Sequence, residues 1–254
     1  MKTLIEFYQH LGWALSLLVM MTFLLAGVVK GMIGLGLPTV AMGLLGLAIA
    51  PAQAAALLIM PSIVTNLWQL ATGGQLRALI ARLWPMQLGI FLGTGMGMLW
   101  LNIEGGGWVV RALGAVLLLY ALSGLFLPTL RVAPSAERWL GPICGVVTGV
   151  ITSATGIFVI PAVPYLQALG LSKNQLVQAL GLSFSVSTLA LAAGLYWRGT
   201  LGAAEFNTSL LALLPAMVGM WLGQWLRQRI SATLFKRVFF IGMALLGAHL
   251  LISG

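Results

Sequence analysis

The sequence predicts an all-α polytopic membrane protein, built from two inverted repeats of about five helical segments each. Three observations carry this prediction: an extreme hydrophobic composition, a series of charge-free runs, and an internal duplication. Of the 254 residues, 60% are hydrophobic and 7% are charged, whereas soluble domains carry about 25% charged residues. A soluble enzyme, a nucleic-acid-binding domain and a disordered chain are excluded, because so few polar groups could not cover the surface of any of them.

Charge-free runs mark the membrane spans. Several runs are close to the roughly 20 residues that one helical span needs. These runs are Leu11–Val29, Leu83–Ile103, Ala112–Leu130, Asn174–Trp197, Phe206–Leu226 and Val238–Gly254. The first of them is of full length and lacks a small-residue cleavage site, so no signal peptide is expected.

Two further runs, Gly31–Leu76 and Trp139–Ser172, are too long for one span. A straight helix of either length would overrun a hydrocarbon core of about 30 Å, so each run must turn within the membrane or at its edge. Residues that break helices are present in both. They are Gly34, Gly36, Pro38, Pro51 and Pro61 in the first run, and Gly156, Pro161, Pro164 and Gly170 in the second. The pattern leaves open whether these segments cross fully or return as hairpins.

The two long runs resemble each other. Gly27-Val-Val-Lys-Gly-Met-Ile-Gly34 reads against Gly145-Val-Val-Thr-Gly-Val-Ile-Thr152. Such self-similarity indicates an internal duplication. We therefore divide the chain into an N-terminal transmembrane repeat at 1–127, a basic cytoplasmic linker at 128–138 and a C-terminal transmembrane repeat at 139–254.

The placement of basic residues predicts that the repeats are inverted. In the first half, Arg77 and Arg82 follow the third segment, whereas in the second half the basic residues gather after the fourth. Because Lys and Arg mark the cytoplasmic side, equivalent loops lie on opposite sides of the membrane. Inverted repeats with broken first helices that meet near the bilayer midplane are typical of secondary transporters.

The same segments carry a family resemblance. Lys30–Pro38 (KGMIGLGLP), Pro51–Ala56 (PAQAAA) and Pro61–Gln69 (PSIVTNLWQ) resemble the sulfite exporter TauE/SafE family, and Gly145–Gly156 with Gln178–Ser183 resembles its counterpart repeat. The resemblance covers most of the chain. It implies a multi-pass permease of the bacterial inner membrane that moves sulfite, sulfonates or related organosulfur anions, usually outward.

Lys30 is the leading candidate for substrate binding. It is a charged residue in a region that is otherwise uncharged from Leu11 to Leu76. An intramembrane charge costs about 2.5–3.5 kcal/mol on insertion scales and usually faces a partner or a water-filled cavity. No carboxylate occurs in a neighbouring span, so an anionic substrate is the expected partner. The alternative is that Lys30 reaches the interface with its long side chain.

Polar side chains and glycines near the breaks complete the predicted binding site. Ser62, Asn66 and Gln69 share one helical face, and Ser183 and Ser187 do the same in the second half. Hydroxyl and amide groups suit a sulfonate oxygen, but they also bond commonly between membrane helices. Ser153 and Thr155 could cap a half-helix or touch the substrate. The candidate substrate-binding residues are Lys30, Gly34, Gly36, Ser62, Asn66, Gln69, Ser153, Thr155, Gln178, Ser183 and Ser187.

These features favour a transporter that exports a small organosulfur anion. Two alternatives remain: a permease of the same fold for a different small anion, and a non-transporting assembly or sensor subunit. An enzyme is not expected, because the carboxylates lie near loops or termini and form no catalytic set. Cys144 is the single cysteine and the two histidines lie at opposite ends of the chain, so neither a metal nor a cofactor is expected. The expected partners are the anion and the lipid bilayer, without nucleic acid, and the choice between monomer and homodimer stays open.

Overall fold

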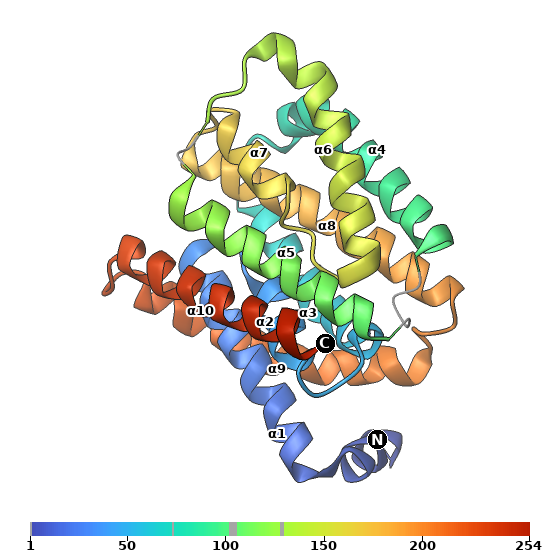
Figure 1. The fold of residues 1–254 in the computed structure, drawn as a ribbon. Coiled ribbons are helices and arrows are strands. Elements are labelled where there is room, and N and C mark those ends of the chain that lie inside the picture. The colour runs from blue at the N-terminus through green and yellow to red at the C-terminus, as the bar shows by residue number, and fades with distance from the viewer. Residues whose placement is uncertain (1, 73, 102–105, 128–129) are drawn as a thin grey trace.

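The structure, a computed structural model, describes residues 2–72, 74–101, 106–127 and 130–254, and within these ranges it is entirely helical (Figure 1). The helices of the first half are α1 (Lys2–Ile33), α2 (Leu37–Leu45), α3 (Pro51–Ala71), α4 (Leu76–Trp100) and α5 (Gly107–Phe126). Those of the second half are α6 (Pro134–Thr155), α7 (Ala162–Ala168), α8 (Lys173–Trp197), α9 (Ala203–Leu226) and α10 (Ala232–Ser253). Side chains are described from residue 13 onward, except that of Ala204.

Two of these helices are too short to cross a membrane. Helix α2 has 9 residues and α7 has 7, which correspond to roughly 14 Å and 11 Å of helix. Each follows a break at glycine. Helix α1 ends just before Gly34 and Gly36, whose φ angles are +78° and +105°, and α6 ends at Gly156 with φ +70°. These left-handed conformations favour glycine because they are strained for residues with a Cβ atom.

Helices from both halves are long and apolar enough to span a membrane. Six segments meet this standard among the residues described: Trp13–Ile33, Pro51–Ala71, Gly107–Phe126, Lys173–Trp197, Glu205–Leu226 and Ala232–Ser253. The expected span Leu83–Ile103 falls largely on α4, which is long enough but carries Pro85, Gln87 and several glycines that lower its hydropathy. The chain is therefore a multi-pass membrane protein.

Exposed aromatic residues fit this environment. All nine tryptophans are exposed, the least of them, Trp108, by 42%, as expected for side chains that face lipid or the membrane interface. The methionines are divided between surface and core, and Met21 is exposed by 55%. Met32, Met42 and Met86 are fully buried and fill the core between helices.

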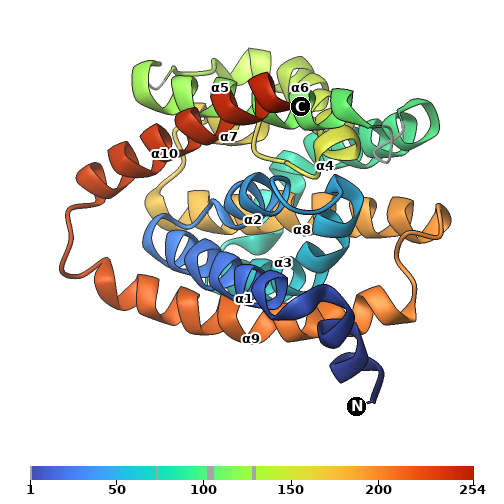
Figure 2. The same cartoon turned by 60° about the horizontal axis from the view of Figure 1, so that its bottom comes forward.

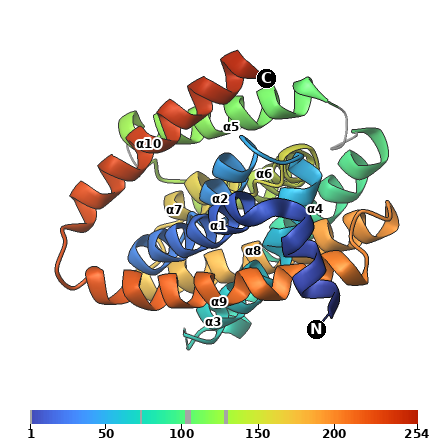
Figure 3. The same ribbon diagram turned by 90° about the horizontal axis from the view of Figure 1, so that it is seen from below.

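Helices of the two halves pack against each other in pairs. Helix α1 lies along α9, α4 lies along α6, and α5 lies along α10 (Figures 2 and 3). Helix α3 packs on α8 and on α9, while α2 and α8 lie between the α1–α9 pair and the α5–α10 pair (Figure 2). Each broken helix, α1 or α6, is thus held mainly by a helix of the other half.

Glycines permit the closest of these contacts. At the α1–α9 crossing, a methyl group on Gly31 would collide with the Met220 carbonyl oxygen, and one on Gly223 would collide with that of Val28. At the α4–α6 crossing, a methyl group on Gly93 would collide with the carbonyl oxygen of Val146, and one on Gly149 would collide with that of Ile90. Glycines at every fourth residue, which are typical of close helix packing in membranes, occur in both crossings. They are Gly89, Gly93 and Gly97 in α4, and Gly219 and Gly223 in α9.

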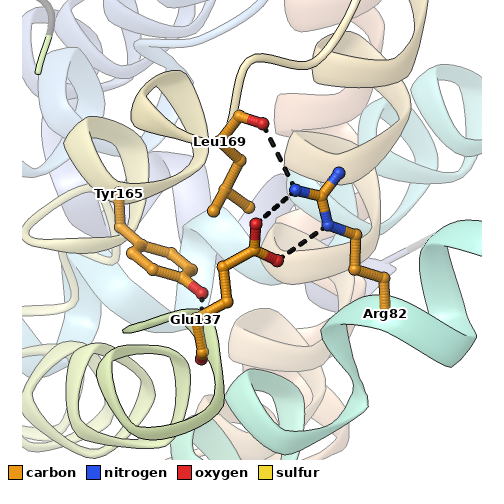
Figure 4. Close-up of polar contacts among 4 residues, drawn as sticks. All are labelled: Arg82, Glu137, Tyr165 and Leu169. Carbon is orange, nitrogen blue, oxygen red and sulfur yellow. Dashed lines mark hydrogen bonds and ion pairs between the residues drawn. The ribbon is translucent and has the colours of Figure 1, made fainter. Parts of the chain in front are cut away.

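An ion pair joins the beginnings of α4 and α6. The guanidinium of Arg82 donates from Nε to Glu137 Oε2 at 2.8 Å and from Nη2 to Oε1 at 2.5 Å (Figure 4). Nη2 also donates to the Leu169 carbonyl at the end of α7 at 3.3 Å. The hydrogen bond to Glu137 raises the pKa of Arg82 above its ordinary value. The guanidinium of Arg82 therefore connects α4 with α6 and with the end of α7.

Candidate functional site

A cavity of about 600 Å³ lies where the two halves meet. Its wall is formed by the end of α1 and the break after it, the end of α3, the first turns of α8, and the facing ends of α9 and α10. Four of its lining residues are cationic: Lys30, Lys173, Arg227 and Lys236. No acidic residue lines it among those described, so the cavity carries a concentrated positive potential that attracts anions.

Lys30 lies at the buried part of this wall. Its side chain is 3% exposed, and its ammonium donates a hydrogen bond to Oδ1 of Asn66 in α3. Because Asn66 is neutral, this contact satisfies one proton of the ammonium but leaves its charge uncompensated. Burial of such a charge is costly unless a counter-ion is supplied.

Asn66 connects Lys30 to the second half of the chain. Its Nδ2 donates to Thr188 Oγ1 at 3.3 Å, and that hydroxyl donates to the Phe184 carbonyl at 2.7 Å. Both of these residues belong to α8. The hydrogen bonds therefore run from α1 through α3 to α8, and they orient the Asn66 amide with its oxygen toward Lys30.

The break after α1 is held by a second amide. Nε2 of Gln69 donates to the Gly34 carbonyl oxygen, while the buried Oε1 of Gln69 has no hydrogen-bond partner in the structure. Gly34 and Gln69 both line the cavity with Lys30. Gly36 does not line it and instead packs against the side chains of Val29 and Phe239.

The candidates on α8 have partners that the sequence did not indicate. Gln178 Nε2 donates to the Leu70 carbonyl at 2.8 Å, and its Oε1 accepts from the Gln75 backbone at 3.1 Å. Ser183 Oγ accepts from Gln87 Nε2 of α4 at 2.9 Å. Gln178 and Ser183 thus form hydrogen bonds that join helices, as polar side chains commonly do in membrane proteins.

Ser62 and Ser187 are fully buried, and neither hydroxyl has a hydrogen-bond partner in the structure. Buried polar atoms without partners are rare in proteins, because the loss of a hydrogen bond to water is not recovered. Neither serine lines the cavity that Lys30 faces.

Ser153 and Thr155 belong to the second break. Ser153 Oγ donates to the Val150 carbonyl at 2.7 Å, and Thr155 Oγ1 accepts from the Ile157 backbone at 3.2 Å. Their hydroxyls thus bond to backbone groups at the end of α6, and neither residue lines the cavity. The structure brings together Lys30, Gly34, Asn66 and Gln69, and it leaves the α6 candidates apart from them.

Sequence reasoning missed three of the four cations. Lys173 begins α8, whereas Arg227 and Lys236 lie on either side of the turn between α9 and α10, and all three are exposed. In the sequence these three residues are cations near helix ends, where basic residues indicate topology. No local signal distinguishes these three from other loop cations, because only the packing of α1, α8 and α9 brings them to one cavity.

The apolar helices and the cationic cavity together define a multi-pass membrane protein with the construction of a transporter. A model of the family described as Sulfite exporter TauE/SafE matches residues 19–250, nearly the whole chain, and the chain therefore belongs to that family. This confirms the resemblance seen in the segments around Lys30 and Pro61. Members of the family are membrane transporters and not enzymes. Neither the curated proteins nor the solved structures that were compared include a significant match.

Proposed function

We propose that the protein exports a small organosulfur anion, such as sulfite or a sulfonate, across the bacterial inner membrane. The observation that carries the proposal is the buried Lys30 ammonium, whose hydrogen-bond partner Asn66 is neutral, on the wall of a cationic cavity. An oxyanion in the cavity would supply the missing counter-charge. Amide groups of Gln69, Asn174 and Gln224, which also line the cavity, suit the oxygen atoms of such an anion.

The architecture we propose for transport is a pair of inverted repeats, α1–α5 and α6–α10. Equivalent helices exchange partners, since α1 packs on α9 as α6 packs on α4, and both crossings use glycines. Helices α3 and α8 pack against each other and are joined by the bond from Asn66 to Thr188. In this arrangement the broken first helices lie near the bilayer midplane, and alternating access follows from movement of one repeat against the other.

In this proposal the cavity opens on the cytoplasmic side of the membrane. Arg227, Arg229, Lys236 and Arg237 cluster around the turn between α9 and α10, and positive residues mark the cytoplasmic face. The substrate would then enter from the cytoplasm. An inside-negative potential favours the outward movement of a monoanion by about 2.3 kcal/mol per 100 mV.

Anion flux in proteoliposomes tests the proposal. Sulfite, sulfoacetate, taurine and sulfate are compared, with membrane potential and pH gradient imposed separately. We expect flux of a sulfur oxyanion, whose net movement into anion-free vesicles follows the voltage, with little flux of the zwitterion taurine. Lys30→Met should abolish this flux and Lys30→Arg should retain part of it. Undiminished flux in both variants would remove Lys30 from the site.

The two alternatives give different results in the same assay. Flux of another small anion, but not of any sulfur oxyanion, would identify a permease of the same fold with a different substrate. The absence of flux for every anion, with folded protein confirmed by size-exclusion chromatography, would favour a non-transporting assembly or sensor subunit.

A further inference from the structure

We infer that this transporter is an anion exchanger, in which the site beside Lys30 changes sides rapidly only when an anion occupies it. The inference rests on the proposed function, because it requires that the Lys30 cavity binds the transported anion. It adds a mode of transport: each exported anion is replaced by a second small anion that enters from outside.

The charge balance at Lys30 is the first part of the argument. Its hydrogen-bond partner is the neutral Asn66. The two carboxylates whose side chains the structure describes are engaged elsewhere: Glu137 binds Arg82, and Glu205 accepts from the Gly202 backbone at 2.9 Å. Without substrate the buried position of Lys30 therefore carries one uncompensated positive charge, which a bound monoanion neutralises.

The second part concerns what happens when the cavity closes. Lys30 is 3% exposed, and the cavity is its contact with solvent. Any change of sides must close that cavity and remove its water. For the loaded site this buries a neutral pair, whereas for the empty site it buries a bare ammonium. The insertion cost of a single intramembrane charge corresponds to a rate difference of about 100-fold.

The third part is that, among the side chains that the structure describes, no carboxylate near Lys30 could act as a counter-ion. Asn66 is held between Lys30 and Thr188 and cannot ionise. The other cations of the cavity, Lys173, Arg227 and Lys236, increase the positive charge and do not balance it. Exchange of one anion for another avoids the empty state altogether.

The test compares exchange with net flux. Proteoliposomes are loaded with unlabelled sulfite or with a non-transported buffer, and the uptake of radiolabelled sulfite is measured under anaerobic conditions. Potassium and valinomycin clamp the membrane potential, so that charge movement does not limit net flux. We expect uptake into sulfite-loaded vesicles to exceed uptake into empty ones at least tenfold. Equal rates in both kinds of vesicle, or net flux that is balanced by proton movement, would overturn the inference.

Two variants connect the ratio to the charge of the site. Asn66→Asp gives Lys30 a permanent counter-charge, so the empty site becomes neutral and the ratio of exchange to net flux should fall toward one. If Asn66→Asp does not fold, Gln69→Glu places a counter-charge on the same wall of the cavity as Lys30 and should lower the ratio in the same way. Arg229→Gln, which removes an exposed cation that does not line the cavity, is the matched control and should keep the wild-type ratio. A high ratio that persists in Asn66→Asp would overturn the inference.

Failure of the underlying function is distinguishable from failure of the exchange mechanism. If no labelled anion enters under either loading condition, while the protein is folded, the cavity does not transport these anions and the inference is overturned together with its premise. If anions enter at the same rate with and without internal anion, the proposed transport holds and the exchange mechanism is wrong.

Discussion

The hydroxyl of Ser209 in α9 forms hydrogen bonds with backbone groups of α3 next to Pro61, where the helical hydrogen bonding is interrupted. Proline has no N–H group, so the Leu57 carbonyl one turn earlier lacks its helical donor. Ser209 Oγ donates to that carbonyl at 2.9 Å and accepts from the Met60 N–H at 2.9 Å. A proline is tolerated in a membrane helix when a neighbour satisfies the freed backbone groups in this way. The contact also fixes α3 of the first half to α9 of the second.

Ser209→Ala should therefore destabilise the protein. The Leu57 carbonyl would be left buried without a donor, at a cost of about 1–3 kcal/mol. Thermal unfolding in detergent measures the loss. In a Pro61→Ala background the new N–H of residue 61 supplies the donor, so the same serine change should cost less. Equal losses in both backgrounds would show that Ser209 stabilises α3 by another route.

The crossing of α4 and α6 offers a matched pair of glycine substitutions in one helix. A methyl group at Gly93 would collide with the backbone of Val146, whereas one at Gly95 meets nothing within 4 Å. Gly93→Ala should separate the helices and cost about 1–3 kcal/mol or more. Gly95→Ala should be neutral, or stabilising by up to about 1 kcal/mol, because alanine favours the helix. Unfolding temperatures in detergent that are the same for both variants would contradict the observed crossing.

The three exposed cations at the cavity should act on substrate capture. Lys173→Gln, Arg227→Gln and Lys236→Gln each remove one charge that attracts an anion, so KM should rise severalfold with a smaller change in maximal flux. Wild-type KM should also rise with salt, and less so in each variant, because added ions screen exposed charges.

Arg229→Gln is the control for this series. Arg229 lies near the same turn, but its guanidinium is stacked over Trp225 at 4.1 Å and does not line the cavity. Its substitution should leave KM and its salt dependence as they are in the wild type. A KM change as large as that of Lys236→Gln would show that net charge of the face, and not the cavity, captures the anion.

The ion pair between Arg82 and Glu137 should matter little for stability. Arg82 is 39% exposed and Glu137 16%, and pairs that reach solvent typically contribute up to about 1 kcal/mol. Arg82→Gln and Glu137→Gln should each lower the unfolding free energy by no more than this amount. The reversed pair, Arg82→Glu with Glu137→Arg, should recover part of the loss. A loss of several kcal/mol in either single variant would contradict this view of the pair.

Much of the fold follows from local features of the sequence. Helix breaks could be placed at Gly34, Gly36 and Gly156, because few other residues adopt positive φ without strain. The close helix contacts could be predicted from glycines spaced four residues apart. These signals need no knowledge of the rest of the molecule, since backbone strain and surface shape are properties of the segment itself.

The candidate site depended on contacts that local patterns do not specify. Lys30 could be singled out because a charge within an apolar run demands a partner. That its partner would be Asn66 was not determined by the shared face of Ser62, Asn66 and Gln69. Ser183 illustrates the limit, because the same hydroxyl could have faced substrate and instead accepts from Gln87. Choices of this kind depend on which helices become neighbours.

The exchange of partners between the two halves has a consequence for biosynthesis. The glycine face of α1 packs against α9, where Gly27 lies against Ala216 and Gly31 lies against Met220 and Gly223, so most of the chain is synthesised before α1 is covered. The first five helices must wait in the bilayer in an incomplete arrangement while the ribosome completes the rest. The first half would therefore be exposed to membrane proteases when translation stops early, and two separately expressed halves should survive only when they are made together.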